Sequence, residues 1–242
     1  MDFSPAPRPA PLVRQIYAHA ITEARLIVRN GEQVLLALVI PISLLIGGRF
    51  FGERFGWSLD AAVPSVFGLA VWSTCFTSLA IVTAFERRYG VLERLNATSL
   101  GKSGVLAGKA AATILICAGQ LVILSVLALA LGWRPTVFSW PGLGALGLAG
   151  LTFAALGLAL GGSLRAETTL GLANLIYLLG LAGGILAPAW AYPPAVQAIL
   201  AWLPTMALGE VLRGAGTFGL VVLAIWTVAA GLLARKVFTW TS

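Results

Sequence analysis

Residues 86–109, ERRYGVLERLNATSLGKSGVLAGK, form the only long charged interruption in an otherwise apolar chain. Seven side chains in this stretch are formally charged, and apolar runs long enough to cross a bilayer flank it on both sides. A charged segment between two such runs must lie at a membrane face, and an excess of Lys and Arg marks the cytoplasmic face. Val91, Leu92 and Leu95 can share one side of a short amphipathic helix within it.

Composition places the whole chain among polytopic membrane proteins. Of its 242 residues, 59% are hydrophobic and 10% are charged, and the mean hydropathy is +0.92. Soluble domains lie outside this range, so the sequence predicts an all-α membrane protein. Cys75 and Cys117 fall inside apolar runs and are expected to be two small buried side chains.

Six apolar segments predict six transmembrane helices within a single transmembrane domain, 34–235. The expected spans are residues 34–51, 61–85, 110–133, 137–162, 168–190 and 217–234. The first is short for a bilayer crossing and contains Pro41. The charged segment 86–109 is expected as a loop between the second and third spans.

The remaining segments have other patterns. Residues 12–33 alternate bases with apolar residues at helical spacing and predict an amphipathic helix in the membrane interface. Residues 192–216 contain three prolines, Glu210 and Arg213, and predict a re-entrant segment at the outer face. Residues 1–11 and 236–242 are expected to be cytoplasmic tails, the first of them disordered.

The distribution of bases supports six crossings with both termini in the cytoplasm. This layout puts twelve Lys and Arg residues inside and four outside, as the positive-inside rule expects. A seventh crossing through 192–216 would move Arg235 and Lys236 outside and weaken the bias. The sixteen bases are therefore explained by topology rather than by nucleic acid.

No residue pattern predicts catalysis. The fragment NATSLGKS, 96–103, resembles a phosphate-binding GxxxxGK[ST] loop, but Asn96 replaces the first glycine and no strand precedes it. His19 has no partner in sequence and is expected at the surface, and no metal-ligand spacing occurs. The spans lack Asp, Glu, Lys and Arg away from their ends, whereas ion-driven carriers place such groups at mid-membrane. Energy is therefore expected to come from outside this chain.

Within the spans, two kinds of residue are candidates for function. Gly157 with Gly161, and Gly180 with Gly184, form GxxxG pairs typical of close helix packing. The candidates for a substrate path are Trp72, Thr74, Gln120, Asn174 and Tyr177. Hydrogen bonds between helices would explain the polar members of this set equally well.

With the charged segment placed between the second and third of six spans, the chain resembles the permeases of ABC-2 type exporters. The resemblance rests on Glu86, Arg87, Arg88, Gly90, Leu92, Glu93, Arg94, Leu95, residues 98–100, Gly108 and Lys109, and later on Leu203, Pro204, Glu210, Leu212 and Arg213. It covers almost the whole chain after Leu12. Ser99 departs from the family pattern, which often has proline there.

The resemblance implies a six-helix permease that pairs with a second copy or a paralogue. Two separate ABC ATPases would carry the ATP and Mg, with no cofactor in this chain. The charged segment would be the coupling element, with Val91, Leu92 and Leu95 in apolar contact with the ATPase or with the interfacial helix. The residues Glu86, Arg87, Arg88, Gly90, Glu93 and Arg94 would complete the coupling set. The alternative is that these charges solvate a loop and fix the topology.

The function expected from this is export of a hydrophobic or amphipathic drug, antibiotic or lipid across a bacterial cytoplasmic (inner) membrane, a role that includes drug efflux and resistance. Two alternatives stay open: a permease for polysaccharide or glycolipid, and a membrane scaffold that transports nothing. A scaffold would leave the amphipathic segment without a purpose.

Overall fold

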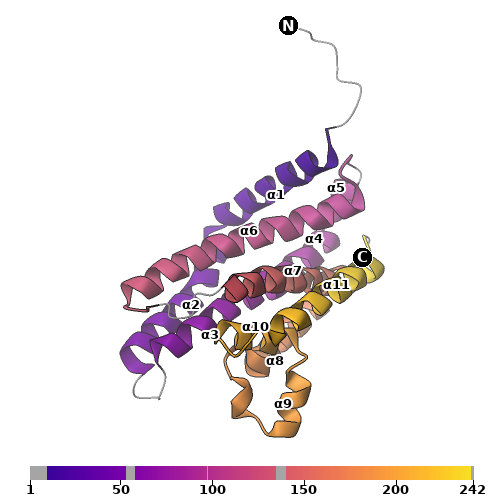
Figure 1. Ribbon diagram of the computed structural model, residues 1–242. Coiled ribbons are helices and arrows are strands. Elements are labelled where there is room, and N and C mark those ends of the chain that lie inside the picture. Colours follow the sequence, from indigo (N-terminus) through magenta and orange to yellow (C-terminus); the bar gives the residue numbers. More distant parts are fainter. Residues whose placement is uncertain (1–9, 53–57, 97, 135–139, 241–242) are drawn as a thin grey trace.

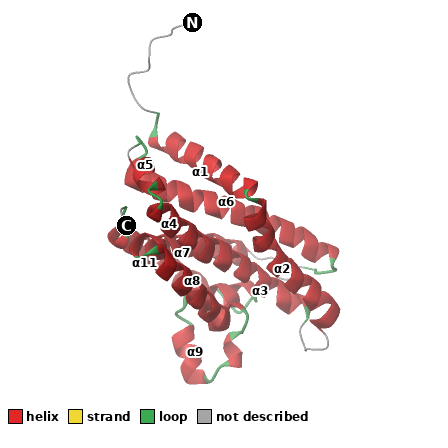
Figure 2. Ribbon diagram, turned by 180° about the vertical axis from the view of Figure 1, so that it is seen from behind, coloured by secondary structure: helices red, strands yellow, loops and turns green. Residues whose placement is uncertain are grey.

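The structure is a computed structural model that describes residues 10–52, 58–96, 98–134 and 140–240; within helices, the side chains of residues 32–34, 36 and 96 are not described. Every regular element in this part of the chain is helical, and none is a strand (Figure 2). The predicted all-α membrane fold is confirmed. The predicted tail 1–11 lies almost wholly outside the described residues.

Eleven α-helices and three shorter helical turns are described along the chain. The α-helices are α1 Leu12–Arg29, α2 Gly31–Phe51, α3 Leu59–Val71, α4 Leu79–Arg88, α5 Val91–Asn96, α6 Gly101–Ala130, α7 Trp140–Ser163, α8 Ala166–Gly180, α9 Pro194–Leu200, α10 Pro204–Leu212 and α11 Phe218–Val237. A π-helical turn, Trp72–Ser78, joins α3 to α4, and a second, Leu181–Ile185, extends α8. The turn Ala189–Ala191 is a short 3-10 helix.

The helices form an elongated bundle with two different ends. In Figure 1, α5, the start of α6 and the end of α11 lie at one end, which we name the α5 end. The helix α9, the end of α2 and the start of α3 lie at the opposite end, the α9 end. The helix α7 packs against α11, α4 and the first π turn and so lies at the centre of the bundle.

Five helical segments are long and apolar enough to cross a membrane. They are Leu59–Arg88, Gly101–Ala130, Trp140–Ser163, Ala166–Ile185 and Phe218–Val237. Each overlaps one of the predicted spans. The remaining predicted span, 34–51, lies in α2, whose described apolar part, Ala37–Phe51, is shorter than the roughly 20 residues that a crossing needs.

The charged segment is more helical than the sequence suggested. Among the described residues, only Tyr89–Gly90 and 98–100 lie between α4, α5 and α6, so residues 101–109 of the expected loop 86–109 belong to α6. The physical reason is length: the 30 residues of α6 span about 45 Å, more than the roughly 30 Å hydrocarbon core, so its charged first turns can lie outside the bilayer.

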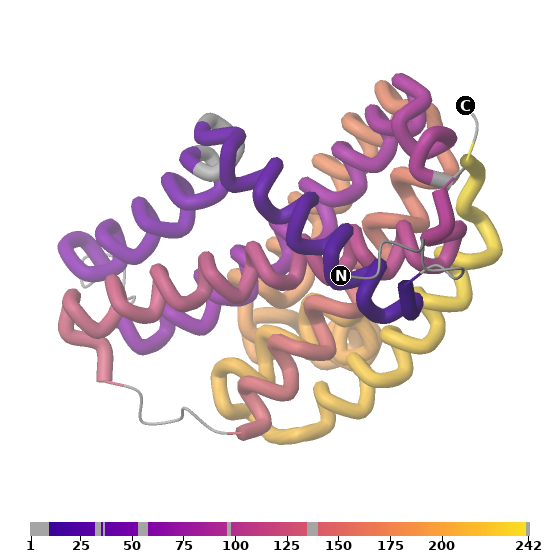
Figure 3. Tube along the Cα trace, turned by 90° about the horizontal axis from the view of Figure 1, so that it is seen from above, coloured from indigo at the N-terminus to yellow at the C-terminus, as the bar shows by residue number. Residues whose placement is uncertain are grey.

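The helix α1 packs along the first half of α6, as Figure 3 shows from above. Ala20 and Ala24 of α1 are buried against Ala112 of α6. The helix ends at Arg29, before the expected boundary at residue 33, because Asn30 leaves the helical region (φ −83°, ψ 79°). Its predicted place in the membrane interface stays a prediction.

The segment expected to re-enter the membrane, 192–216, contains two short helices with a sharp bend. The axes of α9 and α10 are bent by 101° at residues 201–203. Pro194 and Pro204 each occupy the first turn of a helix, where the missing N–H has no cost.

Candidate functional site

A buried ion cluster joins three helices near the α5 end. Lys109 of α6 is 2% exposed, and its Nζ lies 2.8 Å from Glu86 Oε1 on α4 and 3.2 Å from Glu23 Oε2 on α1. His19 of α1 lies beside Glu23, with 3.9 Å between Nε2 and Oε1. One lysine between two carboxylates satisfies its buried charge and fixes the positions of α1, α4 and α6 relative to one another.

Burial lowers the pKa of His19 more than any other influence. Glu23 raises this pKa by its negative charge and Lys109 lowers it further by repulsion. The imidazole is therefore kept neutral at pH 7, beside a lysine that is paired with carboxylates. His19 was expected at the surface, and this expectation is wrong: its side chain is only 11% exposed.

Arg87 turns inward and bonds to the ends of other helices. Its guanidinium donates to the carbonyl oxygens of Gly162 and Leu164 and, at 2.7 Å, to the hydroxyl of Thr239. These carbonyls end α7, where no helical N–H can reach them. Arg87 thus joins the ends of α4, α7 and α11. Arg88 faces outward and pairs with Glu167 at the start of α8.

The short helix α5 has one anchored face and one free face. Leu92 is fully buried and Leu95 partly buried, in a cluster that includes Ile16 of α1. Val91, Glu93 and Arg94 are exposed. Of the three residues predicted to make apolar contacts, Leu92 and Leu95 therefore pack against other helices of this chain, whereas Val91 stays exposed. Gly90, with φ +69°, makes the turn that positions the helix.

Four of the five candidate path residues line one groove of about 900 Å³. They are Thr74, Gln120, Asn174 and Tyr177. Its lining residues come from α1, α2, the first π turn, α4, α6 and α8. None of the described residues that line it is charged.

Several polar groups of this groove are already bonded within the chain. Thr74 Oγ1 donates to Gln120 Oε1 at 2.8 Å, and Gln120 Nε2 donates to the Ala37 carbonyl at 2.8 Å. Asn174 Nδ2 donates to the Leu170 carbonyl. By contrast, the hydroxyl of Thr77 is buried and has no hydrogen-bond partner among the described residues. Thr77 also lies in the wall of the groove.

The first π turn determines which residues face the groove. A π-helical turn shifts the register of the residues that follow it, and such turns are frequent at functional sites. Thr74 and Thr77 line the groove, while Trp72 lies on the other side of the segment, 3% exposed, with its indole N–H donating to the Tyr177 carbonyl at 3.1 Å. Trp72 instead lines a second groove, together with Phe76.

A smaller cavity shares lining residues with both the ion cluster and the groove. Its volume is about 50 Å³, and its wall includes Glu23, Lys109, Thr74 and Ser78. Thr74 and Ser78 also line the large groove. A movement of Lys109 or Glu23 would therefore act directly on the groove wall.

The four packing glycines lie at close approaches. A Cβ on Gly157 would be 2.7 Å from the Phe76 carbonyl oxygen, and one on Gly161 would overlap the Ala80 carbonyl. A Cβ on Gly180 would be 2.6 Å from the indole nitrogen of Trp72. Gly184 does not extend a helical face, because its φ of +124° breaks the helix beside Met206.

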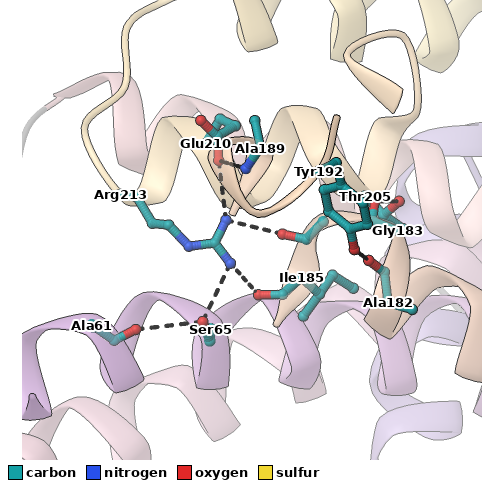
Figure 4. Close-up of polar contacts among 11 residues, drawn as sticks. Ala61, Ser65, Ala182, Gly183, Ile185, Ala189, Tyr192, Thr205, Glu210 and Arg213 are labelled. Carbon is teal, nitrogen blue, oxygen red and sulfur yellow. Dashed lines mark hydrogen bonds and ion pairs between the residues drawn. The ribbon is translucent and has the colours of Figure 1, made fainter. Parts of the chain in front are cut away.

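At the α9 end, side chains from the bent segment bond to the last carbonyls of the α8 segment (Figure 4). Arg213 donates to the carbonyls of Gly184 and Ile185, and Thr205 donates to that of Gly183 at 2.8 Å. Tyr192 donates to that of Ala182. Four successive carbonyls left free by the helix end thus receive side-chain donors. Sequence reasoning missed this network, although Arg213 between glycines and prolines was its one visible signal.

Fold and site define a multi-pass membrane protein, with a charged helical surface at one end and an uncharged groove among its spans. The model of the ABC-2 type transporter family matches residues 14–217, and the chain belongs to this family. The membrane subunit of such a transporter is not itself the catalytic part. A comparison with curated proteins found no match.

Proposed function

We propose that this chain is the membrane subunit of an ATP-driven exporter, that separate ATPases supply the energy, and that its cargo is a neutral hydrophobic or amphipathic compound such as a drug, an antibiotic or a lipid. ATP and Mg would be bound by the ATPases. Membership of the ABC-2 type transporter family supports the transport role.

The observation that carries the coupling part of the proposal is the two-sided burial of α5. Leu92 is 0% exposed, which fixes the helix to the chain, while Val91 is 38% exposed beside the free charges of Glu93 and Arg94. A helix held rigidly on one face can transmit a push applied to the other. The ATPase would bind Val91, Glu93 and Arg94, whereas Glu86 and Arg87 would act from inside the chain.

The ion cluster would transmit the movement. Lys109 contacts both Glu86 on α4 and Glu23 on α1, and the small cavity beside it shares Thr74 with the groove. Displacement of α5 and the end of α4 would change the distance between α4 and α1, which both line the groove. Because packed helices shift between discrete arrangements, a small push can open or close such a groove.

The chemistry of the groove supports an uncharged cargo. A charged compound among uncharged walls would lose its hydration without a counter-ion. An amphipathic compound could leave its apolar part against Ile81, Leu115 and Ile123 and accept a hydrogen bond from the hydroxyl of Thr77.

A charge reversal on α5 tests the proposal. Glu93→Lys should reduce, by several-fold, the ATP hydrolysis that co-purifies with the tagged chain from its native membranes, because it reverses the charge of an exposed side chain on the proposed docking face. Asp60→Lys makes the same change in charge on an exposed residue at the α9 end and should leave that activity intact. Equal ATPase activity in both variants and the wild type, at equal amounts of chain in the membrane, would overturn the coupling role.

A further inference from the structure

The second groove differs from the first in chemistry and position. It has a volume of about 590 Å³ and lies between α7, α8 and α11, on the side of the first π turn that carries Trp72 and Phe76. The start of α10, with Leu203 and Pro204, lines the part nearest the α9 end. Ser163 and Val237, the last residues of α7 and α11, line it near the α5 end.

Every hydrogen-bond donor in the wall of this groove is already engaged. The indole of Trp72 donates to Tyr177 and that of Trp226 to the Trp202 carbonyl at 2.8 Å. The hydroxyl of Thr205 donates to Gly183, and that of Ser163 to the Leu160 carbonyl at 3.2 Å. The remaining lining is hydrocarbon, so the groove suits an acyl chain better than a polar ligand.

The length of the groove matches one leaflet of a bilayer. Along α11 it extends from Trp226 to Val237, a rise of about 16 Å at 1.5 Å per residue. Half of a hydrocarbon core of about 30 Å is about 15 Å. A single lipid chain from the leaflet at the α5 end would therefore fill it.

The mouth of the groove is fixed by contacts between helix ends. The backbone N–H of Thr239 donates to the Gly162 carbonyl at 2.9 Å, and Phe238 packs against Gly162. These contacts hold the ends of α7 and α11 together. They place Arg165, which follows α7, and Lys236, near the end of α11, at the same end of the groove.

The cations at this mouth have no counter-ion. Arg165, Arg235 and Lys236 are exposed, and none has an ion-pair partner among the described residues. Arg88, by comparison, is paired with Glu167. Exposed basic residues beside a membrane surface attract anionic lipids by roughly 1 kcal/mol each.

We propose that this groove binds one acyl chain of an anionic phospholipid, whose headgroup phosphate lies against Arg165 and Lys236. The site is separate from the cargo groove, because Trp72 and Thr74 face opposite sides of the π turn. The inference goes beyond the proposed function and does not depend on the ATPase. A lipid seated here would contact Trp72 and Phe76 directly and so stabilise the π turn.

Native mass spectrometry of the purified chain, relipidated with equal amounts of phosphatidylglycerol and phosphatidylcholine of matched chains, tests the headgroup. Wild-type protein should retain one phosphatidylglycerol more than the double variant Arg165→Gln/Lys236→Gln. The control Arg25→Gln/Arg29→Gln removes two exposed bases from α1 and should retain as much as wild type. Equal retention in all three proteins, or equal retention of the two lipids, would overturn the proposal.

A second pair of variants tests the groove itself. Leu233→Trp should fill the groove and abolish retention. Leu232→Trp changes an exposed neighbour on the same helix that does not line the groove, and should leave retention unchanged. If inorganic phosphate alone raised the melting temperature as much as phosphatidylglycerol does, the site would bind phosphate rather than lipid. If Leu233→Trp dissociated a dimer, the groove would be an interface with a second copy. Either result would overturn the proposal.

Discussion

Lys109 is the residue on which the packing at the α5 end depends most. A charge that is 2% exposed is tolerated because two carboxylates, Glu86 and Glu23, lie within 3.2 Å of its ammonium group. The sequence singled out Glu86 and Lys109 separately, as parts of a family pattern. Their contact across 23 residues could not be predicted, because it depends on how α4 and α6 pack.

Lys109→Met should therefore destabilise the chain by roughly 3 kcal/mol, the lower end of the cost of breaking a buried ion pair, because it leaves two carboxylates without a cation. Thermal unfolding in detergent would measure the loss. Lys102→Met removes an exposed lysine, the second residue of α6, and should change the midpoint little. A decrease of equal size in the unfolding midpoints of both variants would show that the ion cluster contributes no more to stability than an exposed lysine does.

His19 gives the molecule a pH-dependent stability of known sign. Because burial lowers its pKa in the folded state, the unfolded chain binds a proton more readily, and stability falls as the pH drops below about 6.5. The melting temperature of the wild type should decrease between pH 7.5 and 5.5 by more than that of His19→Gln. Glu23 and Glu86 remain in both proteins, so the difference between the two changes in melting temperature reports His19 alone. If the melting temperatures of both proteins changed equally with pH, the burial of His19 would be contradicted.

The candidate path residues show what sequence can predict at this scale. Thr74, Gln120, Asn174 and Tyr177 were selected as polar residues in apolar spans, and they do share a groove. Trp72 does not lie there, because the π turn between α3 and α4 directs it to the opposite side. No local sequence signal indicated that turn.

At the scale of elements, close contact between helices is decided by single glycines. Along α7, Gly157 and Gly161 lie against the backbone of the first π turn and α4, while Gly147 faces open space. The GxxxG spacing predicted that the first two would pack. It could not predict the partner, which is the segment 75–83 rather than a second GxxxG helix.

Gly161→Ala should separate α7 from α4, since its Cβ would overlap the Ala80 carbonyl, and should cost about 1–3 kcal/mol, as overpacking does. Gly147→Ala makes the same substitution in the same helix without a neighbour within 4 Å and should be neutral or slightly stabilising. Thermal unfolding of both variants side by side is the measurement. Equal midpoints would mean that the close approach does not constrain the bundle.

The ends of elements were harder to predict than their existence. Five of the predicted spans coincide with long apolar helices, because hydropathy reports them directly. The charged segment 86–109 was expected as a loop, but charge does not prevent a helix from continuing beyond the bilayer. The cap on the end of the α8 segment joins Arg213 to residues about 30 positions earlier and has no local sequence pattern.

At the scale of the whole molecule, the account depends on the two ends of the bundle being different. The α5 end has α5 with its free charged face, the ion cluster and the basic mouth of the second groove. The α9 end has the bent segment and its capped carbonyls. The twelve-to-four distribution of bases predicts that the α5 end is cytoplasmic, and both the ATPase and the lipid proposals require it.

Labelling with a membrane-impermeant maleimide tests this orientation directly. Glu93→Cys on α5 and Gln197→Cys on α9 place thiols at the two ends, and the native Cys75 and Cys117 are buried. The account predicts that Glu93→Cys reacts in inside-out vesicles and not in intact cells, and that Gln197→Cys reacts in intact cells. Labelling of Glu93→Cys from outside intact cells would contradict it.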